Sequence, residues 1–312
     1  MPCGRSATAE PYKHRLQSPR TARCRQSVPW VVLAVNIALL GVACGEKHAY
    51  GGHFVLTKAK SSLPPPGLPP VRTVISMANC QSEDERERTA ELIRPILRGR
   101  DIKRYGYNWA NLWLIYIPWH FPYQFDESIK GASDKAEEAF KEQYPAVYNH
   151  MLQYKEPLSK RNKAETGIRY EWYAMQRWGA KYWEDFSKPK IVWGNLNLKP
   201  SYAIVEDNSF INAPSPMIVP ASRYLLAILN SKLADYFIRQ LGVTRNGGYF
   251  EYKPMFIEQL PVPQCLDNSI LKEIDTNVAI KNEKIIDTIV YSLYGLNDKE
   301  IQYIEKGTQE NY

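Results

Sequence analysis

The sequence has 312 residues, 44% of them hydrophobic and 23% charged, with a formal net charge of +7. This length allows one large domain or two ordinary ones, and the apolar fraction argues against global disorder. The five cysteines form no Cys-x-x-Cys pair, and only His120 and His150 lie beyond residue 60. These counts argue against a zinc ribbon, a disulfide framework and a histidine-based metal site.

The positive charge is unevenly distributed along the chain. Residues 1–80 carry ten Lys/Arg and two Asp/Glu, a net charge of +8, whereas residues 81–312 carry 30 and 31. Within the second part, residues 94–199 have a local surplus of six positive charges. Any attraction to a polyanion is therefore expected to be local.

The first 80 residues differ in composition from the rest, with a basic start, an apolar run at 28–44 and a proline-rich stretch at 63–70. The apolar run has a basic flank and ends at Cys44, which resembles a secretory or lipoprotein signal. Alternatively, the segment is mis-started or fused, and the natural start is Met77. We favour this second interpretation, in which residues 1–76 are disordered and the protein is cytoplasmic, with no membrane partner.

From residue 81 onward, the patterns predict a series of helices and strands. The first expected element is a helix at 82–98, capped by Ser82 and interrupted by Pro95. A strand at 112–119 follows, and then a helix at 133–161 with breaks at Pro145 and Pro157. Two strands are expected next, at 190–197 and 202–205. A helix at 222–241, a turn at 246–248, a strand at 249–252, a helix at 270–293 closed by Gly295, and a final helix capped by Asn297 and Glu300 follow.

These elements predict an α+β fold in which a β-rich region with inserted helices precedes a helical C-terminal third. We expect three parts: an atypical segment at 1–80 outside the fold, a domain at 81–265 and a helical tail at 266–312. Motifs for dinucleotides (Gly-x-Gly-x-x-Gly), for P-loop phosphates and for a Gly-x-Ser-x-Gly nucleophile are missing from the sequence. We therefore expect no catalytic residue, no metal site and no cofactor in this chain.

Four cations lie within seven residues at the run RGRDIKR (98–104), which has Gly99 inside it and Gly106 two residues after it. Such a loop suits phosphates or the acceptor edge of guanine. The alternative is a solvated loop in which Asp101 pairs with one arginine. The candidate DNA-binding residues here are Arg98, Arg100, Lys103 and Arg104.

Aromatic residues gather at 105–186, which holds 20 of the 38 Phe, Trp and Tyr of the chain. Interleaved with cations, they suit a nucleic-acid surface with stacking, whereas the alternative is an aromatic core. We expect a core role for Trp113, Tyr116 and Trp119, and leave both open for Trp172, Tyr173 and Trp178. The candidate DNA-binding residues of this region are Lys160, Arg161, Trp172 and Arg177.

Three further candidates are expected, Asn195 on the strand at 191–198 and Arg245 and Asn246 on the turn after the helix at 222–241. Arg reads guanine and Asn reads adenine through paired hydrogen bonds, which makes Asn195, Arg245 and Asn246 candidate base-reading residues. Ordinary turn capping is the alternative for Asn246.

An ordered set of landmarks then resembles a known family. Residues 96–105 (ILRGRDIKRY) are similar to the opening of the TaqI-like C-terminal specificity domain, the target recognition domain of type IIG restriction–modification adenine-specific DNA methyltransferases. Later landmarks agree in order: YPAVY at 144–148, YEWY at 170–173, KPKIV at 188–192, YLLAILNSK at 224–232, QLPVP at 259–263 and IVYSLYGLN at 289–297. The resemblance spans residues 85–306.

The resemblance implies a module that recognises double-stranded DNA and directs adenine-N6 methylation by a domain that binds S-adenosylmethionine and flips the target base. This chain has no Asn-Pro-Pro-Tyr motif and no S-adenosylmethionine segment. We therefore expect a fragment that lacks the methyltransferase domain and any nuclease domain, is inactive alone and needs a methyltransferase domain or subunit, in a family with or without an endonuclease. Alternatives are a stand-alone specificity subunit that docks a methyltransferase through helix 270–293, an exported or lipid-anchored binding protein, and a decayed product without function.

Overall fold

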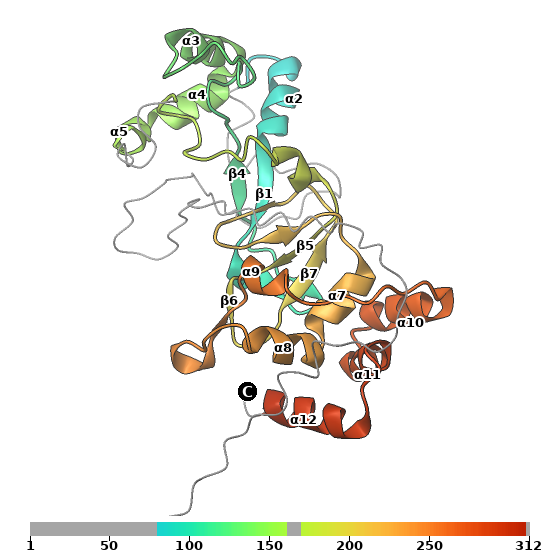
Figure 1. The fold of residues 1–312 in the computed structure, drawn as a ribbon. Helices are drawn as coiled ribbons and strands as arrows, with labels where there is room; N and C mark the ends of the chain where they lie inside the picture. The colour runs from blue at the N-terminus through green and yellow to red at the C-terminus, as the bar shows by residue number, and fades with distance from the viewer. Residues whose placement is uncertain (1–79, 161–169, 310–312) are drawn as a thin grey trace, which may run out of the picture. The chain divides into compact units, whose positions relative to one another are not determined.

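The computed structural model of the protein describes residues 80–160 and 170–309. The apolar run at 28–44, the predicted N-terminal disorder and Arg161 lie outside the described residues. Within the described ranges, no helix combines the length and the apolar character that a membrane crossing requires. Small sheets, inserted helices and a helical C-terminal region confirm the predicted α+β class (Figure 1).

The described elements follow one another along the chain in a mixed order. They are α2 (Glu83–Leu92), β1 (Ile93–Leu97), β2 (Ile102–Lys103), β3 (Gly106–Tyr107), β4 (Trp113–Ile115), α3 (Asp134–Gln143), α4 (Pro145–Leu152), α5 (Lys155–Ser159), β5 (Lys190–Trp193), β6 (Leu196–Asn197), β7 (Tyr202–Val205), β8 (Phe210–Ile211), β9 (Met217–Ile218), α7 (Arg223–Asn230), α8 (Lys232–Arg239), β10 (Phe250–Glu251), α9 (Pro254–Ile257), α10 (Asn268–Ala279), α11 (Glu283–Leu293) and α12 (Asp298–Gln309).

The sheet β7-β5-β9 lies between two hydrophobic cores, and its central strand is buried on both faces. Ile191 and Trp193 belong to the core that includes α7, α8 and the C-terminal helices, whereas Val192 belongs to the core that includes β1, β4 and β8. This alternation follows from the two-residue period of a strand. A third core joins α3 and α4 to the start of β1 and to β4.

The predicted helix at 82–98 is wrong in its second half. Ser82 caps α2, its Oγ accepting a hydrogen bond from the Glu85 backbone N–H, but the helix ends at Leu92 and β1 follows directly. Proline disfavours a helical conformation in the preceding residue and lacks an N–H of its own, so Pro95 ends the helix early. β1 then pairs with β4 on one side and with β8 on the other.

Other predicted elements are present but shorter or divided. The helix expected at 133–161 is three helices, and Pro145 begins the second of them, where its missing N–H costs nothing. The strand expected at 190–197 is interrupted between β5 and β6, and the strand at 202–205 is confirmed as β7.

The helix expected at 222–241 is broken at Ser231. Ser231 has an extended backbone, donates a hydrogen bond from Oγ to the Ile228 carbonyl, and accepts one from the Ala234 N–H. It therefore ends α7 and caps α8, a dual use of a serine hydroxyl that hydrophobic periodicity does not reveal. Figure 1 shows α7 beside β7, with α8 following it.

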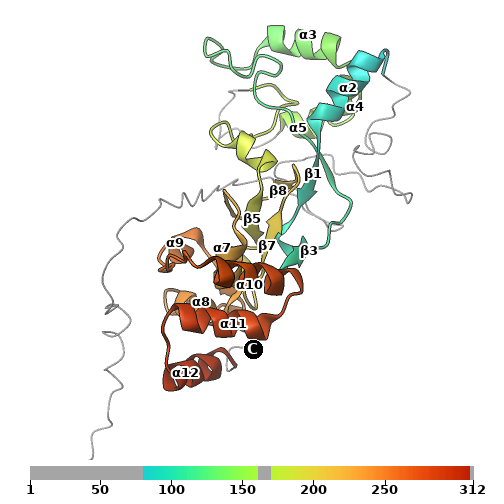
Figure 2. The ribbon, with the colours of Figure 1, turned by 90° about the vertical axis from the view of Figure 1, so that its right-hand side faces the viewer.

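The helix expected at 270–293 is likewise two helices, α10 and α11, because Lys281 adopts a left-handed conformation and Asn282 caps α11. Gly295 closes α11 at φ 64°, and Asn297 and Glu300 form the predicted capping box of α12. Figure 2 shows α10, α11 and α12 in succession. All three contribute to the same core as β5, and they pack against α7 and α8.

Candidate nucleic-acid interface

The predicted basic run forms a tight turn that begins where β1 ends. Arg98 donates from Nε to Asp101 Oδ2 (2.9 Å) and from a terminal nitrogen to Oδ1 (2.7 Å), and its backbone N–H also reaches Oδ2 (3.0 Å). Asp101 is only 6% exposed. The expected internal pairing of Asp101 is therefore present, and it holds Arg98 in the turn.

The cations that follow Arg98 differ sharply from one another. Arg104 makes an ion pair with Glu283 of α11 (2.8 Å), lies against the ring of Tyr105, and is 15% exposed. Arg100 and Lys103 are exposed, and Lys103 Nζ donates to the Arg100 carbonyl (2.7 Å). Two cations of the run thus support the fold, and two face solvent.

The basic turn packs directly against the turn between β5 and β6. A Cβ built on Gly99 would lie 2.9 Å from Ser215 Oγ and 3.2 Å from the Gly194 Cα. Asn197 donates from Nδ2 to the Gly194 carbonyl (2.7 Å) and so closes the second turn, which carries the half-buried Asn195. The backbones approach this closely only because both facing residues are glycines.

A third turn joins the same surface through the pairing of β6 with β10. Phe250 is opposite Asn197, Glu251 is opposite Leu196, and the Tyr252 N–H donates to the Asn195 carbonyl (2.8 Å). Arg245 and Asn246 stand where the hairpin into β10 reverses. Its tip is the pair Gly247 and Gly248, both with positive φ.

We call this region the three-turn surface and define it as residues 98–103, 194–198 and 244–251. Its rear is fixed by a buried network: Asp235 accepts from Arg239 Nε (2.9 Å) and from the Tyr252 hydroxyl (2.8 Å). Arg239 also donates to the Leu198 carbonyl and to the Tyr252 hydroxyl (3.0 Å). Helix α8 is thereby tied to both edges of the β6–β10 ribbon. The surface includes these predicted residues: Arg98, Arg100, Lys103, Asn195, Arg245 and Asn246, with Arg104 next to it in the chain.

The remaining predicted residues lie elsewhere. Lys160, at the end of α5, pairs with Glu156 (2.6 Å). Trp172 donates from Nε1 to Glu137 of α3 (2.7 Å), and Lys155 lies over its ring. Arg177 is half-buried in the segment before the short 3-10 helix Trp183–Ser187. These side chains are grouped with α3 and α5 or with the second core, and their role in DNA binding stays a prediction.

The aromatic residues are mostly core residues. Trp113, Tyr116, Tyr173 and Trp178 are each less than 9% exposed, and Trp119 is half-buried with Nε1 donating to the Met175 carbonyl. The core interpretation of Trp113 and Tyr116 is confirmed. It also covers Tyr173 and Trp178, for which the sequence left two options.

Sequence reasoning missed the outward side chains of the β6–β10 ribbon. Leu196, Leu198 and Tyr249 are 49%, 48% and 41% exposed, and Glu251 is half-buried between two cations. Phe250 and Tyr252 are buried, at 0% and 1%. The alternation at 249–252 was the available signal, because a strand with one buried face points every second side chain to solvent.

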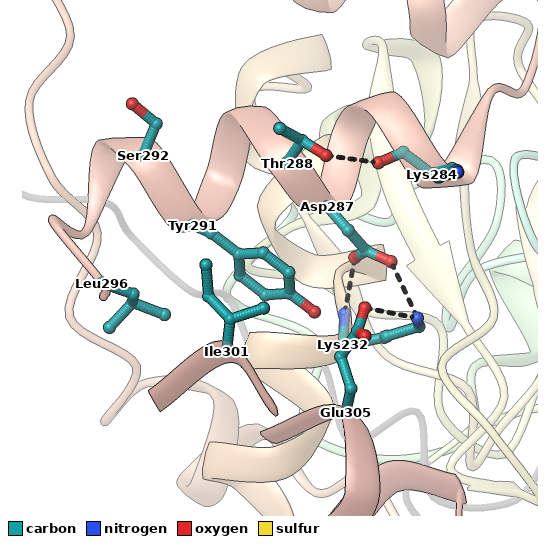
Figure 3. Close-up of a pocket in the computed structure, with 9 residues that line it drawn as sticks. All are labelled: Lys232, Lys284, Asp287, Thr288, Tyr291, Ser292, Leu296, Ile301 and Glu305. Atoms are coloured by element: carbon teal, nitrogen blue, oxygen red, sulfur yellow. Dashed lines mark hydrogen bonds and ion pairs between the residues drawn. The ribbon is translucent and has the colours of Figure 1, made fainter. Parts of the chain in front are cut away.

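A pocket of about 370 Å³ lies between α8, α11 and α12. Figure 3 shows Lys232 at its wall, close to Glu305 (3.0 Å) and Asp287 (3.9 Å), and burial raises the pKa of Asp287. These charged groups satisfy one another. Across the described part of the chain, no group of three His, Cys, Asp or Glu side chains could hold a metal ion.

Comparison with known proteins gives the family of this chain. Residues 94–262, more than half of the chain, match the TaqI-like C-terminal specificity domain, and the chain belongs to this family.

Among individual proteins, the type II methyltransferase M.MjaIV of Methanocaldococcus jannaschii is 26% identical over 179 residues, which are 55% of this chain and 55% of the relative. The chain therefore spans about half the length of the curated relative it matches. A structure of the type IIL restriction-modification enzyme MmeI in complex with DNA is 12% identical, with a TM-score of 0.44, covering 74% of this chain and 33% of that chain.

Proposed function

We propose that this protein recognises a specific sequence in double-stranded DNA and thereby directs adenine-N6 methylation by a methyltransferase domain or subunit. The observation that carries the proposal is the packing of Gly99 against Gly194, which puts exposed cations and base-reading side chain types on one surface. Membership of the specificity-domain family supports the same conclusion.

The side chains of the three-turn surface divide into two groups by chemistry. Arg100 and Lys103 are exposed cations on the basic turn, and we assign them to phosphates, which fix register without reading sequence. Asn195, Arg245 and Asn246 lie on the other two turns, and we assign them to base edges. Arg98 and Arg104 support this surface through Asp101 and Glu283.

Catalysis is assigned to a partner in this proposal. The matched relative is named a type II methyltransferase, and this chain corresponds to about half its length. S-adenosylmethionine would be held by that methyltransferase domain, on the same polypeptide or on a separate subunit, with or without an endonuclease in the complete enzyme. Because the proposed ligand is DNA, we place its action in the cytoplasm.

A salt titration tests the DNA-binding part. Binding of the full chain to a mixed-sequence duplex would be followed by fluorescence anisotropy between low and physiological salt. We expect Arg100→Gln with Lys103→Gln to weaken binding and to reduce the slope of log K against log [salt] by about 1.8. The matched control, Lys299→Gln with Lys306→Gln, removes two exposed cations from α12 and should leave the slope unchanged. Equal slopes for the two double variants would contradict the assignment.

A further inference from the structure

The β6–β10 ribbon has one buried and one exposed face, and the exposed face carries apolar, acidic and basic side chains. Phe250 and Tyr252 point into the core, whereas Tyr249 and Glu251 point outward, opposite Leu196 on the neighbouring strand. On the other side of β10, Arg245 lies opposite Tyr249, and the Arg245 N–H donates to the Tyr249 carbonyl (2.6 Å). A two-stranded ribbon of this width fits the major groove of B-DNA.

Arg245 is the arginine of this exposed face, and a carboxylate holds it. One of its terminal nitrogens donates to Glu251 Oε2 (3.0 Å), and the Arg245 side chain is 55% exposed. Lys253 contacts the same oxygen (2.7 Å). Lys253 and Arg245 lower the pKa of Glu251, so the carboxylate is ionised at neutral pH and is held by two ion pairs.

Arg245 has more hydrogen-bond donors available for a ligand than Arg98 has. Asp101 engages both Nε and a terminal nitrogen of Arg98, whose side chain is 14% exposed. Glu251 engages one terminal nitrogen of Arg245, and a guanidinium has five N–H donors in a planar fork. Arg245 therefore keeps a pair of donors for a ligand, while its orientation is already set.

We propose that Arg245 is the guanine-reading residue of this surface and that Glu251 is its positioning residue. The inference rests on the proposed function and adds to it a base, a groove and a residue. Guanine presents two acceptors, O6 and N7, at the spacing of the arginine fork in the major groove. Holding the side chain in advance lowers the entropy lost on binding. Leu196, Leu198 and Tyr249 flank the pair and supply apolar contact with neighbouring bases.

Selection of binding sites from a pool of randomised duplexes tests this assignment with the full chain. The wild type should select sites with guanine at one position, by about 5- to 150-fold over other bases. Arg245→Lys keeps the charge and loses the fork, so guanine preference should disappear at that position alone. Glu251→Gln should weaken the preference at the same position, because a neutral amide holds the guanidinium less firmly.

Lys299→Gln is the matched control, since it removes an exposed cation from α12, outside the three-turn surface. It should leave each base preference intact. The proposal is overturned if Arg245→Lys retains every base preference, or loses affinity uniformly while its urea midpoint equals that of the wild type. A wild-type chain that selects no sequence at all would instead refute the proposed function.

Discussion

Gly99 and Gly194 face each other with no side chain between them: a Cβ on Gly194 would lie 3.1 Å from the carbonyl oxygen of Gly99. Ser215 is buried, lies two residues before β9, and also packs against Gly99. The contact holds the basic turn against the turn before β6. Since β6 in turn pairs with β10, the three turns are placed by a single chain of backbone contacts.

Substitution of Gly99 is expected to disturb both stability and DNA binding. The Cβ of Gly99→Ala would meet Ser215 Oγ at 2.9 Å and the Gly194 backbone at 3.2 Å. Such overpacking costs about 1–3 kcal/mol, and urea denaturation would measure it. Gly106→Ala is the control, because its Cβ would meet only the end of Lys281 at 3.6 Å. Similar losses in both variants would contradict the importance of this contact.

Arg98 and Arg100 should behave oppositely although they are two residues apart. Arg98→Ala leaves the carboxylate of Asp101, 6% exposed, without its guanidinium, and should cost about 1.5–3 kcal/mol in free energy of unfolding. Arg100→Ala should change stability by less than about 0.5 kcal/mol and weaken DNA binding. Paired urea and anisotropy measurements separate the two effects. A stable Arg98→Ala variant would show that the pair contributes little.

The network behind the ribbon is expected to be a major stabilising feature. Asp235 is fully buried and accepts hydrogen bonds from Arg239 and Tyr252. Asp235→Ala leaves a buried guanidinium unpaired, which costs about 3–5 kcal/mol. Thermal and urea unfolding would measure the loss. Glu156→Ala removes an exposed ion pair with Lys160 and should leave both midpoints unchanged.

Lys190 should make stability depend on pH in the alkaline range. Its ammonium is buried at the start of β5 and donates to the carbonyls of Phe186 (2.8 Å) and Asp207 (2.8 Å), and burial lowers its pKa to about 8. An unfolded lysine titrates at about 10.4. Between these values the unfolded chain binds more protons, so the free energy of unfolding should rise with pH from about 8 to 10.

Above about pH 10 the direction reverses. Burial raises the pKa of Tyr202 and Tyr252, so the unfolded chain loses protons that the folded chain keeps. Urea titrations of the wild type and of Lys190→Met between pH 7 and 11 isolate the lysine, since both proteins share the tyrosines. The variant should lack the rise between 8 and 10. An identical rise in both proteins would contradict the assignment.

Much of the fold was predictable from local pattern. Periodicity located α7, α8, α10 and α11, and the Asn297–Glu300 box located α12. Their breaks were not predictable, because Ser231 and Asn282 are ordinary polar residues in apolar periods until their caps are seen. The early end of α2 was predictable, because Pro95 disfavours a helical conformation in the residue before it.

The candidate site was predictable in composition and not in geometry. Arg100, Asn195 and Arg245 were selected by chemistry from three distant stretches, and the pairing of β6 with β10 joins the two turns that carry Asn195 and Arg245. The sequence could not show which cations of residues 98–104 support the fold and which face solvent. The partner of Arg104, for example, is Glu283, 179 positions away in the chain. Glu251 was not predicted, because its contacts with Arg245 and Lys253 are visible only in the structure.

The most direct test of the central claim is hydrogen exchange of the full chain with and without duplex DNA at low salt. If the three-turn surface contacts DNA, amides in residues 98–103, 194–198 and 244–251 should exchange more slowly in the complex, while those of α10 and α12 should be unchanged. Protection confined to α3–α5 or to the C-terminal helices, with the three turns exchanging as in the free protein, would contradict the account.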